Sequence, residues 1–197
     1  MKNHLKTKDV LLLALLTAVY FLLYMLSTLI MTPLGILGHS MSPGITGFLG
    51  GSVIYFISRK IGKFGQFTIM TLILMAAFAL MGGAYLPWLI SSTVFALLAD
   101  LLASRSKDVS VHKLAIANGL LGLGSILGAI IPATFFVTSF RETWLKRGQT
   151  AADMEAYIKY SSGVYAILAM VVVFTLCTLG VYVGRAILKK HLKEDNN

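Results

Sequence analysis

Residues 10–58 read VLLLALLTAVYFLLYMLSTLIMTPLGILGHSMSPGITGFLGGSVIYFIS, and none of these 49 positions carries a formal charge. A helix that crosses a hydrocarbon core of roughly 30 Å needs about 20 residues, so this run is long enough for two crossings. Two proline motifs, Thr32-Pro33-Leu34-Gly35 and Ser42-Pro43-Gly44, mark the turn between them, because proline stops or starts helices. We therefore predict membrane-spanning helices over about 10–31 and 43–58.

Three further runs without charge follow, over 64–99, 114–140 and 160–184. Gly82-Gly83 and Pro87 interrupt the first of them near its centre, which favours two short crossings joined by a tight turn. The sequence thus predicts four more helices, over about 66–82, 86–104, 113–138 and 161–188. The predicted fold class is all-α, a polytopic membrane protein with six transmembrane helices in a single integral membrane domain over residues 1–197.

Composition also argues for a membrane protein and against a soluble enzyme. Of 197 residues, 57% are apolar and 13% are charged, whereas soluble domains have about 45–50% apolar and about 25% charged residues. The net charge is +9, but the charges lie in short clusters between apolar runs, which indicates contact with membrane lipid rather than nucleic acid. The single cysteine, Cys177, lies inside an apolar run, and we expect it to be a packing group.

Orientation is predicted from lysine and arginine, which are enriched on the cytoplasmic side of membrane proteins. Six crossings place both termini on one side with the second and fourth loops, and this side carries 13 of the 17 basic residues. The other side carries four, Arg141, Lys146, Arg147 and Lys159. Both termini are therefore predicted to lie in the cytoplasm.

Ionisable groups are nearly absent from the predicted spans, which disfavours a proton- or sodium-driven carrier. Asp100 is the only acid inside a span, and we expect a salt bridge with Arg59, Arg105 or Lys113 at the inner surface, with a conformational latch as the alternative. Asn118, near the inner end of its helix, is expected to hydrogen-bond between helices.

Groups for catalysis or cofactor binding are also missing. No pair of aspartates lies in neighbouring spans, no serine and histidine form an intramembrane dyad, and no G-x-x-x-x-G-K-[ST] phosphate loop is present. Cysteine and histidine spacing offers no metal cage. We therefore expect no enzymatic activity, no cofactor, no metal and no ATP hydrolysis by this chain.

Four predicted helices carry pairs of small residues four positions apart, which stack on one helix face. The pairs are Ala14 and Ala18, Gly47 and Gly51, Gly124 and Gly128, and Gly180 and Gly184. In lipid, small residues let helix backbones approach closely. The ordinary role of such pairs is packing of the bundle, but Ala14 and Ala18 lie among leucines near the inner leaflet, where a partner protein could press.

The segment Ala14-Leu15-Leu16-Thr17-Ala18, early in the first of six helices, resembles the substrate-binding S component of an energy-coupling-factor (ECF) transporter. Four further segments are similar to the MptD/Trep_Strep branch of S components: Pro43-Gly44 through Gly51, Ile54-Tyr55, Arg59 through Gly65, and Ala99-Asp100-Leu101-Leu102. The resemblance implies a bacterial cytoplasmic membrane protein whose Ala14 and Ala18 dock on a T component, which two ATPase subunits drive. It also implies capture of a micronutrient, vitamin-like or tetrapyrrole/haem-like, from outside, followed by toppling of the subunit in the bilayer.

The S-component resemblance also implies a substrate site in the outer half, beneath the first, third and fifth loops. Projected onto this chain, its substrate-binding residues are His39, Met41, Tyr85, Trp88, Phe136, Ser139, Tyr160 and Tyr165. Aromatic groups with a few polar ones suit a flat, largely apolar ligand, although tyrosine and tryptophan also collect at membrane interfaces. His39 with Met41 could ligate a metal or haem iron, but a lone loop histidine more often faces solvent.

The loop over 139–160 is long and charged, and Thr150 is expected to cap a short helix over 151–160. Trp144 suits the headgroup zone, so this loop is either an interfacial segment or a mobile lid. The alternative function is a nonenzymatic membrane scaffold or regulatory protein without a transported ligand. An outward cavity of several hundred Å³ favours transport over a scaffold.

Overall fold

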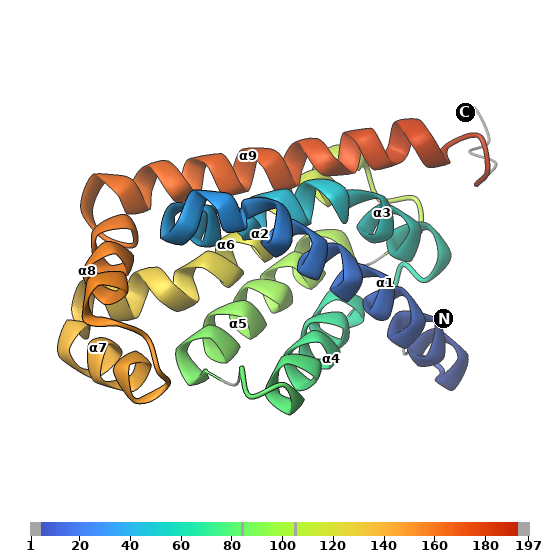
Figure 1. Cartoon of the computed structure of the whole chain (residues 1–197). Helices are drawn as coiled ribbons and strands as arrows, with labels where there is room; N and C mark the ends of the chain where they lie inside the picture. Colours follow the sequence, from blue (N-terminus) through green and yellow to red (C-terminus); the bar gives the residue numbers. More distant parts are fainter. Residues whose placement is uncertain (1–4, 84, 105, 193–197) are drawn as a thin grey trace.

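The computed structural model describes residues 5–83, 85–104 and 106–192, and the regular elements in these ranges are helices (Figure 1). They are α1 (Thr7–Met31), the 3-10 turn η1 (Thr32–Leu34), α2 (Gly35–Leu49), α3 (Gly51–Lys60), α4 (Gln66–Leu80), α5 (Leu86–Ala103), α6 (Val111–Phe135), α7 (Val137–Lys146), α8 (Ala151–Tyr160) and α9 (Gly163–Leu188). The predicted all-α class is confirmed.

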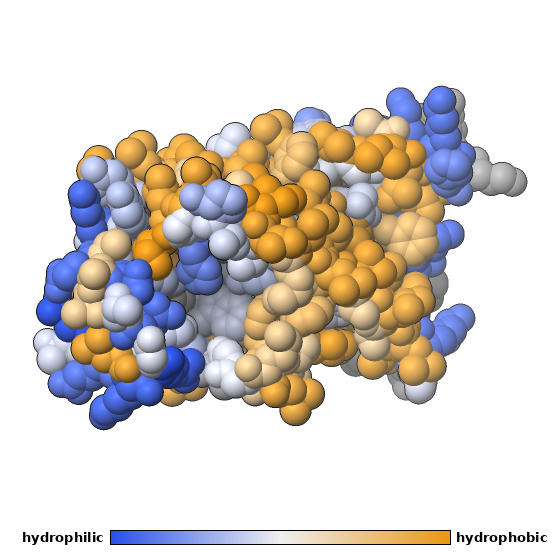
Figure 2. All heavy atoms as spheres, in the orientation of Figure 1, coloured by the Kyte–Doolittle hydropathy of each residue, from blue (hydrophilic) through white to orange (hydrophobic). Residues whose placement is uncertain are grey.

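The helices form a bundle with two different ends. The short helices α7 and α8 lie at one end, hereafter the cap end, and the start of α1 and the end of α9 lie at the other (Figure 1). A broad hydrophobic band covers the middle of the bundle, between hydrophilic residues at the cap end and others near the termini (Figure 2). This distribution is that of a bundle immersed in lipid.

Four segments are long and apolar enough to cross a membrane: Thr7–Leu49, which contains α1 and α2, and the helices α5, α6 and α9. Helix α4 is apolar but has only 15 residues. The six-crossing division and the cytoplasmic position of the termini stay predictions. The 13 basic residues assigned to the cytoplasmic side include Lys2, Arg105 and Lys193, and these three lie outside the described residues.

The prediction of a loop over 32–42 was wrong, because α2 begins at Gly35 and continues through Pro43 to Leu49. Proline has no N–H, so the carbonyl of His39, one turn earlier, loses its helical partner. The Ser42 hydroxyl donates a hydrogen bond to this carbonyl at 2.9 Å and satisfies it. The predicted single helix over 43–58 is instead divided at Gly50 between α2 and α3.

The closest approach between helices follows the glycine pairs of α2, α3 and α9. A Cβ atom added at Gly180 would lie 2.5 Å from the Gly47 carbonyl oxygen, and one at Gly184 would lie 2.5 Å from the Ser52 Cα. Only glycine permits backbones to meet at such distances. The predicted packing role of Gly47, Gly51, Gly180 and Gly184 is confirmed.

Helices α5 and α6 meet in the same way. A Cβ atom at Gly124 would lie 2.6 Å from the Phe95 Cβ, and one at Gly128 would lie 2.5 Å from the Trp88 Cα. The glycine pair Gly124 and Gly128 therefore brings α6 against the backbone of α5 and fixes the position of Trp88.

Asn118 joins three helices, as the sequence predicted. It is fully buried on α6, and its amide nitrogen donates to the Gly47 carbonyl of α2 at 2.9 Å and to the Cys177 carbonyl of α9 at 2.7 Å. The Cys177 side chain is buried beside it, where it packs against the helices as expected.

The prediction for Asp100 needs correction, since the described residues give this buried carboxylate no ion pair. It instead accepts hydrogen bonds from the first turn of α4, from the Phe67 N–H at 3.1 Å and the Thr68 N–H at 2.8 Å. The hydroxyls of Thr68 and Ser104 each donate to it at 2.6 Å. The positive end of the α4 helix dipole favours the charge there, so a cation is not needed.

Of the three cations expected near Asp100, Arg59 makes other contacts, and Lys113 is exposed at the start of α6 with no ion pair to Asp100 among the described residues. Arg59 donates to the backbone carbonyls of Lys107 and Val109, the latter at 3.1 Å, and Arg105 lies outside the described residues. These contacts hold the α5–α6 connection against the end of α3.

Replacing Asp100 with alanine should lower the free energy of unfolding by about 1.5–3 kcal/mol, because two backbone N–H groups of α4 lose their charged acceptor. Thermal unfolding of the detergent-purified protein measures this effect. Asp108→Ala, at an exposed position in the α5–α6 connection, is the matched control and should leave the melting temperature unchanged. Equal melting temperatures for the two variants would contradict the capping role of Asp100.

Candidate functional site

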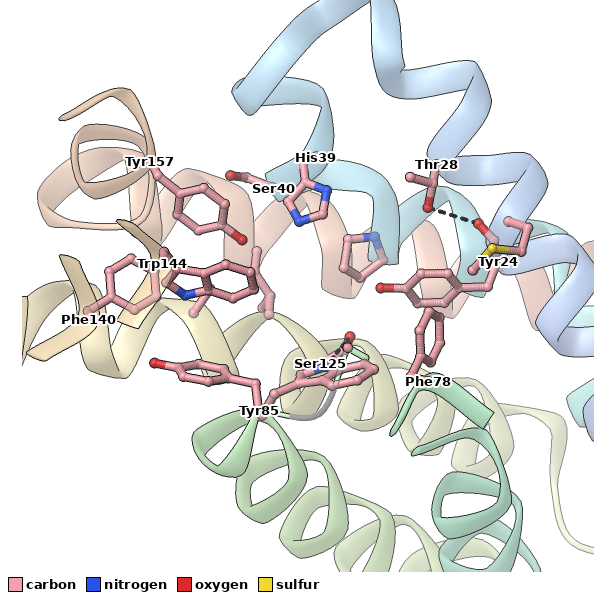
Figure 3. A pocket seen from close by; sticks show the side chains of 17 residues that line it. Tyr24, Thr28, His39, Ser40, Phe78, Tyr85, Ser125, Phe140, Trp144 and Tyr157 are labelled. Atoms are coloured by element: carbon pink, nitrogen blue, oxygen red, sulfur yellow. Dashed lines mark hydrogen bonds between the residues drawn. The ribbon is translucent and has the colours of Figure 1, made fainter. Parts of the chain in front are cut away.

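A cavity of about 230 Å³ lies toward the cap end of the bundle, and seven helices, α1, α2, α4, α5, α6, α7 and α8, contribute to its wall. The surface is hollowed between the hydrophilic cap end and the hydrophobic band (Figure 2). Figure 3 shows the side chains that surround the space.

The walls of the cavity are aromatic. On the side of α1, α4 and α5, Phe78 packs edge-to-face on Tyr24 and Trp88, with ring centroids 4.8 and 5.2 Å apart. On the cap side, the rings in contact are Tyr85, Phe140, Trp144 and Tyr157. Two groups of rings thus line the cavity on different sides (Figure 3), which suits a flat ligand that stacks on aromatic surfaces.

The polar groups at the cavity are few and uncharged. The hydroxyls of Tyr24 and Tyr157 and the ring of His39 point into the space (Figure 3). The Ser125 hydroxyl accepts a hydrogen bond from the Trp88 indole N–H at 3.3 Å. Burial raises the pKa of Tyr157, so its hydroxyl stays protonated at neutral pH and can donate. No Asp, Glu, Lys or Arg is among the described lining residues.

Helices α7 and α8 form a cap with its own small core. Phe140 and Met154 are almost fully buried there, and Arg141 of α7 pairs with Glu155 of α8 at 2.7 Å. Thr150 accepts a hydrogen bond from the Asp153 N–H at 3.1 Å, which confirms the predicted cap of the 151–160 helix. The segment treated as a loop is thus two helices that close one side of the cavity.

The structure brings together three of the residues projected as substrate-binding. His39, Tyr85 and Trp88 all line the cavity. Phe136 and Ser139 lie along a neighbouring groove instead, because α6 ends at Phe135 and the chain turns there into α7.

Met41, Tyr160 and Tyr165 line neither the cavity nor this groove. Tyr160 and Tyr165 pack edge-to-face on each other at the α8–α9 corner, with ring centroids 5.4 Å apart. Met41 is two residues from His39 on α2, and side chains at that spacing point to nearly opposite sides of a helix. The pair therefore does not converge on one metal. Among the described residues no three His, Cys, Asp or Glu side chains gather for a metal ion.

Sequence reasoning missed Tyr24, Phe78, Phe140 and Tyr157 as lining residues, and it expected Trp144 only in the headgroup zone, although this side chain also lines the cavity. Phe140 and Trp144 are four residues apart, and that spacing was the available signal for an amphipathic α7. Tyr24 and Phe78 lie in uniformly apolar helices, where no periodic pattern distinguishes the inward face.

Ala14 and Ala18 lie on the exposed face of α1. Leu11, Leu15 and Leu22 on the same face are each about two-thirds exposed. Three of the four small-residue pairs are thus covered by neighbouring helices, whereas the described residues leave this fourth pair uncovered.

Comparison with known proteins gives one family. A family described as a hypothetical bacterial integral membrane protein (Trep_Strep) matches residues 7–194. No curated protein and no solved structure matches the chain.

Phe140→Ala should loosen the cap, because truncation of a buried phenylalanine removes about 3–5 kcal/mol of packing. We expect faster backbone amide exchange over residues 137–160 and little change in α5 and α6, as measured by hydrogen–deuterium exchange. Phe136→Ala, at a position 62% exposed, is the control and should leave exchange unaltered. Equal exchange in both variants would show that the Phe140 cluster does not hold the cap.

Proposed function

The chain belongs to the Trep_Strep family of hypothetical bacterial integral membrane proteins, and from this premise we propose that it is the substrate-binding S component of an ECF-type importer. In this role it captures a small solute in the aromatic cavity and delivers it with an external ATPase motor. One observation carries the proposal: an aromatic cavity at the cap end occurs together with an uncovered small-residue face on α1.

The cavity favours a flat, uncharged ligand of modest size. Its volume of about 230 Å³ is below the range of about 300–1,000 Å³ typical of sites for drug-sized ligands. One or two fused rings suit this space better than a tetrapyrrole, and His39 and Met41 do not converge as axial ligands. We therefore favour a vitamin-like heteroaromatic compound that stacks between the two aromatic walls and hydrogen-bonds to Tyr24, His39 or Tyr157.

The proposed orientation places the cap end outside the bacterial cytoplasmic membrane and both termini in the cytoplasm. Six crossings accommodate this arrangement if α2 with α3, and α4, each span the bilayer as broken or short helices. The ligand then enters from the outside, and α7 and α8 cover it.

The uncovered alanine face supplies the contact with the motor. A flat surface of small residues lets a second helix approach closely, which is how helices associate in lipid. We propose that Ala14 and Ala18 meet a coupling helix of the T component, which two ATPases drive, and that the whole subunit topples to release its ligand. The chain itself performs no chemical step in this scheme. A ligand-free scaffold is the alternative, and the open aromatic cavity argues against it.

Ligand binding can be followed through tryptophan fluorescence, because the chain has two tryptophans and both Trp88 and Trp144 line the cavity. A fraction of cell extract that contains the ligand should change the emission of the purified protein. Ala129→Leu places a larger side chain at the cavity wall. It should weaken binding by roughly 5- to 150-fold, since overpacking costs about 1–3 kcal/mol.

The control for this titration is Ala152→Leu at an exposed position on α8, which should bind as the wild type does. An emission change that is the same in Ala129→Leu and in the wild type would place the ligand elsewhere. Mass spectrometry of the active fraction then identifies the compound.

Docking is tested with the double substitution of Ala14 and Ala18 to tryptophan. Two bulky side chains on the exposed face should abolish co-purification with a T component. The two added tryptophans contribute a constant emission, and the apparent affinity in the fluorescence titration should stay as in the wild type. Leu29→Trp, at a position 69% exposed on the same helix, is the control and should retain association. Unchanged association of the double variant would remove the docking assignment without affecting the ligand site.

A further inference from the structure

A second cavity of about 730 Å³ lies on the outside of the bundle, where α5 meets α6 and α7. The α5 part of its wall runs from Leu86 to Phe95, a rise of about 14 Å at about 1.5 Å per residue. One leaflet of the hydrocarbon core is roughly half of 30 Å thick. The groove therefore matches the length of an acyl chain within one leaflet.

The walls of this groove face outward and are apolar. Ile90 is 55% exposed, Val94 is 47% exposed and Ile131 is 38% exposed. In a bilayer these side chains meet lipid, and an unfilled groove would forfeit dispersion contacts along its whole length. A flexible hydrocarbon chain fills such a shape.

The end of the groove at the cap is polar and basic. Ser139, Thr143 and Arg147 follow one another at four-residue spacing along α7 and its C-terminal cap, so they share a face. The Arg147 guanidinium carbon lies 5.2 Å from the Trp144 ring and 6.0 Å from the Tyr85 ring. Aromatic rings of this kind mark the interface with the headgroups, and arginine is suited to bind phosphate.

We propose that this groove binds an anionic phospholipid of the leaflet on the cap side, with one acyl chain along α5 and the phosphate at Arg147. The hydroxyls of Ser139 and Thr143 lie beside the headgroup. The site is separate from the aromatic cavity, although Tyr85 and Phe140 contribute to both walls. It does not depend on the proposed transport function.

The test uses the full-length protein in nanodiscs that contain equal amounts of phosphatidylglycerol and phosphatidylcholine, with lipids that remain bound identified by native mass spectrometry. The wild type should retain one phosphatidylglycerol in preference to phosphatidylcholine. Arg147→Gln should reduce this preference by about fivefold, the effect of one basic side chain near a membrane surface. Lys146→Gln removes the same charge from the neighbouring exposed position and should keep the preference.

A second pair of variants separates the acyl chain from the headgroup. Val94→Trp fills the groove and should abolish retention of both lipids, whereas Val171→Trp, at a position 58% exposed on α9, should retain them. Retention of both lipids in equal amounts by the wild type would overturn the proposal. An equal loss of the preference for phosphatidylglycerol in Arg147→Gln and Lys146→Gln would overturn it as well. A dimer that Val94→Trp converts to a monomer would assign the groove to a second copy and would also overturn it.

Discussion

The arrangement of this protein depends on direct backbone contact between helices at glycine. In lipid, apolar side chains gain little by meeting one another, so helices associate where small residues allow close approach and where a polar group bonds across the interface. Gly47, Gly180 and Gly184 provide the approach between α2, α3 and α9. Asn118 adds the hydrogen bonds that tie α6 to α2 and α9.

The position of α6 then determines where the aromatic cavity lies. Gly124 and Gly128 bring α5 against α6 and hold Trp88 at the cavity, and the end of α6 leads directly into α7. Packing at glycine joins the helices at the centre of the bundle, whereas toward the cap end aromatic side chains make contacts between helices. These rings also surround an open space, and the alanine face of α1 stays uncovered.

Much of the helix pattern could be predicted, because runs without charge and pairs of small residues report directly on membrane crossing and close packing. The passage of α2 through Pro43 could not, since the hydroxyl of Ser42 donates to the carbonyl that Pro43 leaves without its helical partner. An intramembrane acid such as Asp100 suggested an ion pair, but its carboxylate accepts hydrogen bonds from the N-terminus of α4, more than 30 residues earlier in the chain. The cavity was predicted only in part, through His39, Tyr85 and Trp88, because α7 and α8 supply the other wall by tertiary contact rather than by a motif.

The central claim is that the space between the two aromatic walls is a ligand site. A high-resolution structure of the protein, purified in mild detergent from its own membrane, tests it most directly. We predict a flat density between Trp88 and Trp144, within hydrogen-bonding distance of Tyr24, His39 or Tyr157. A structure in which these rings pack against one another and leave no space would contradict the claim.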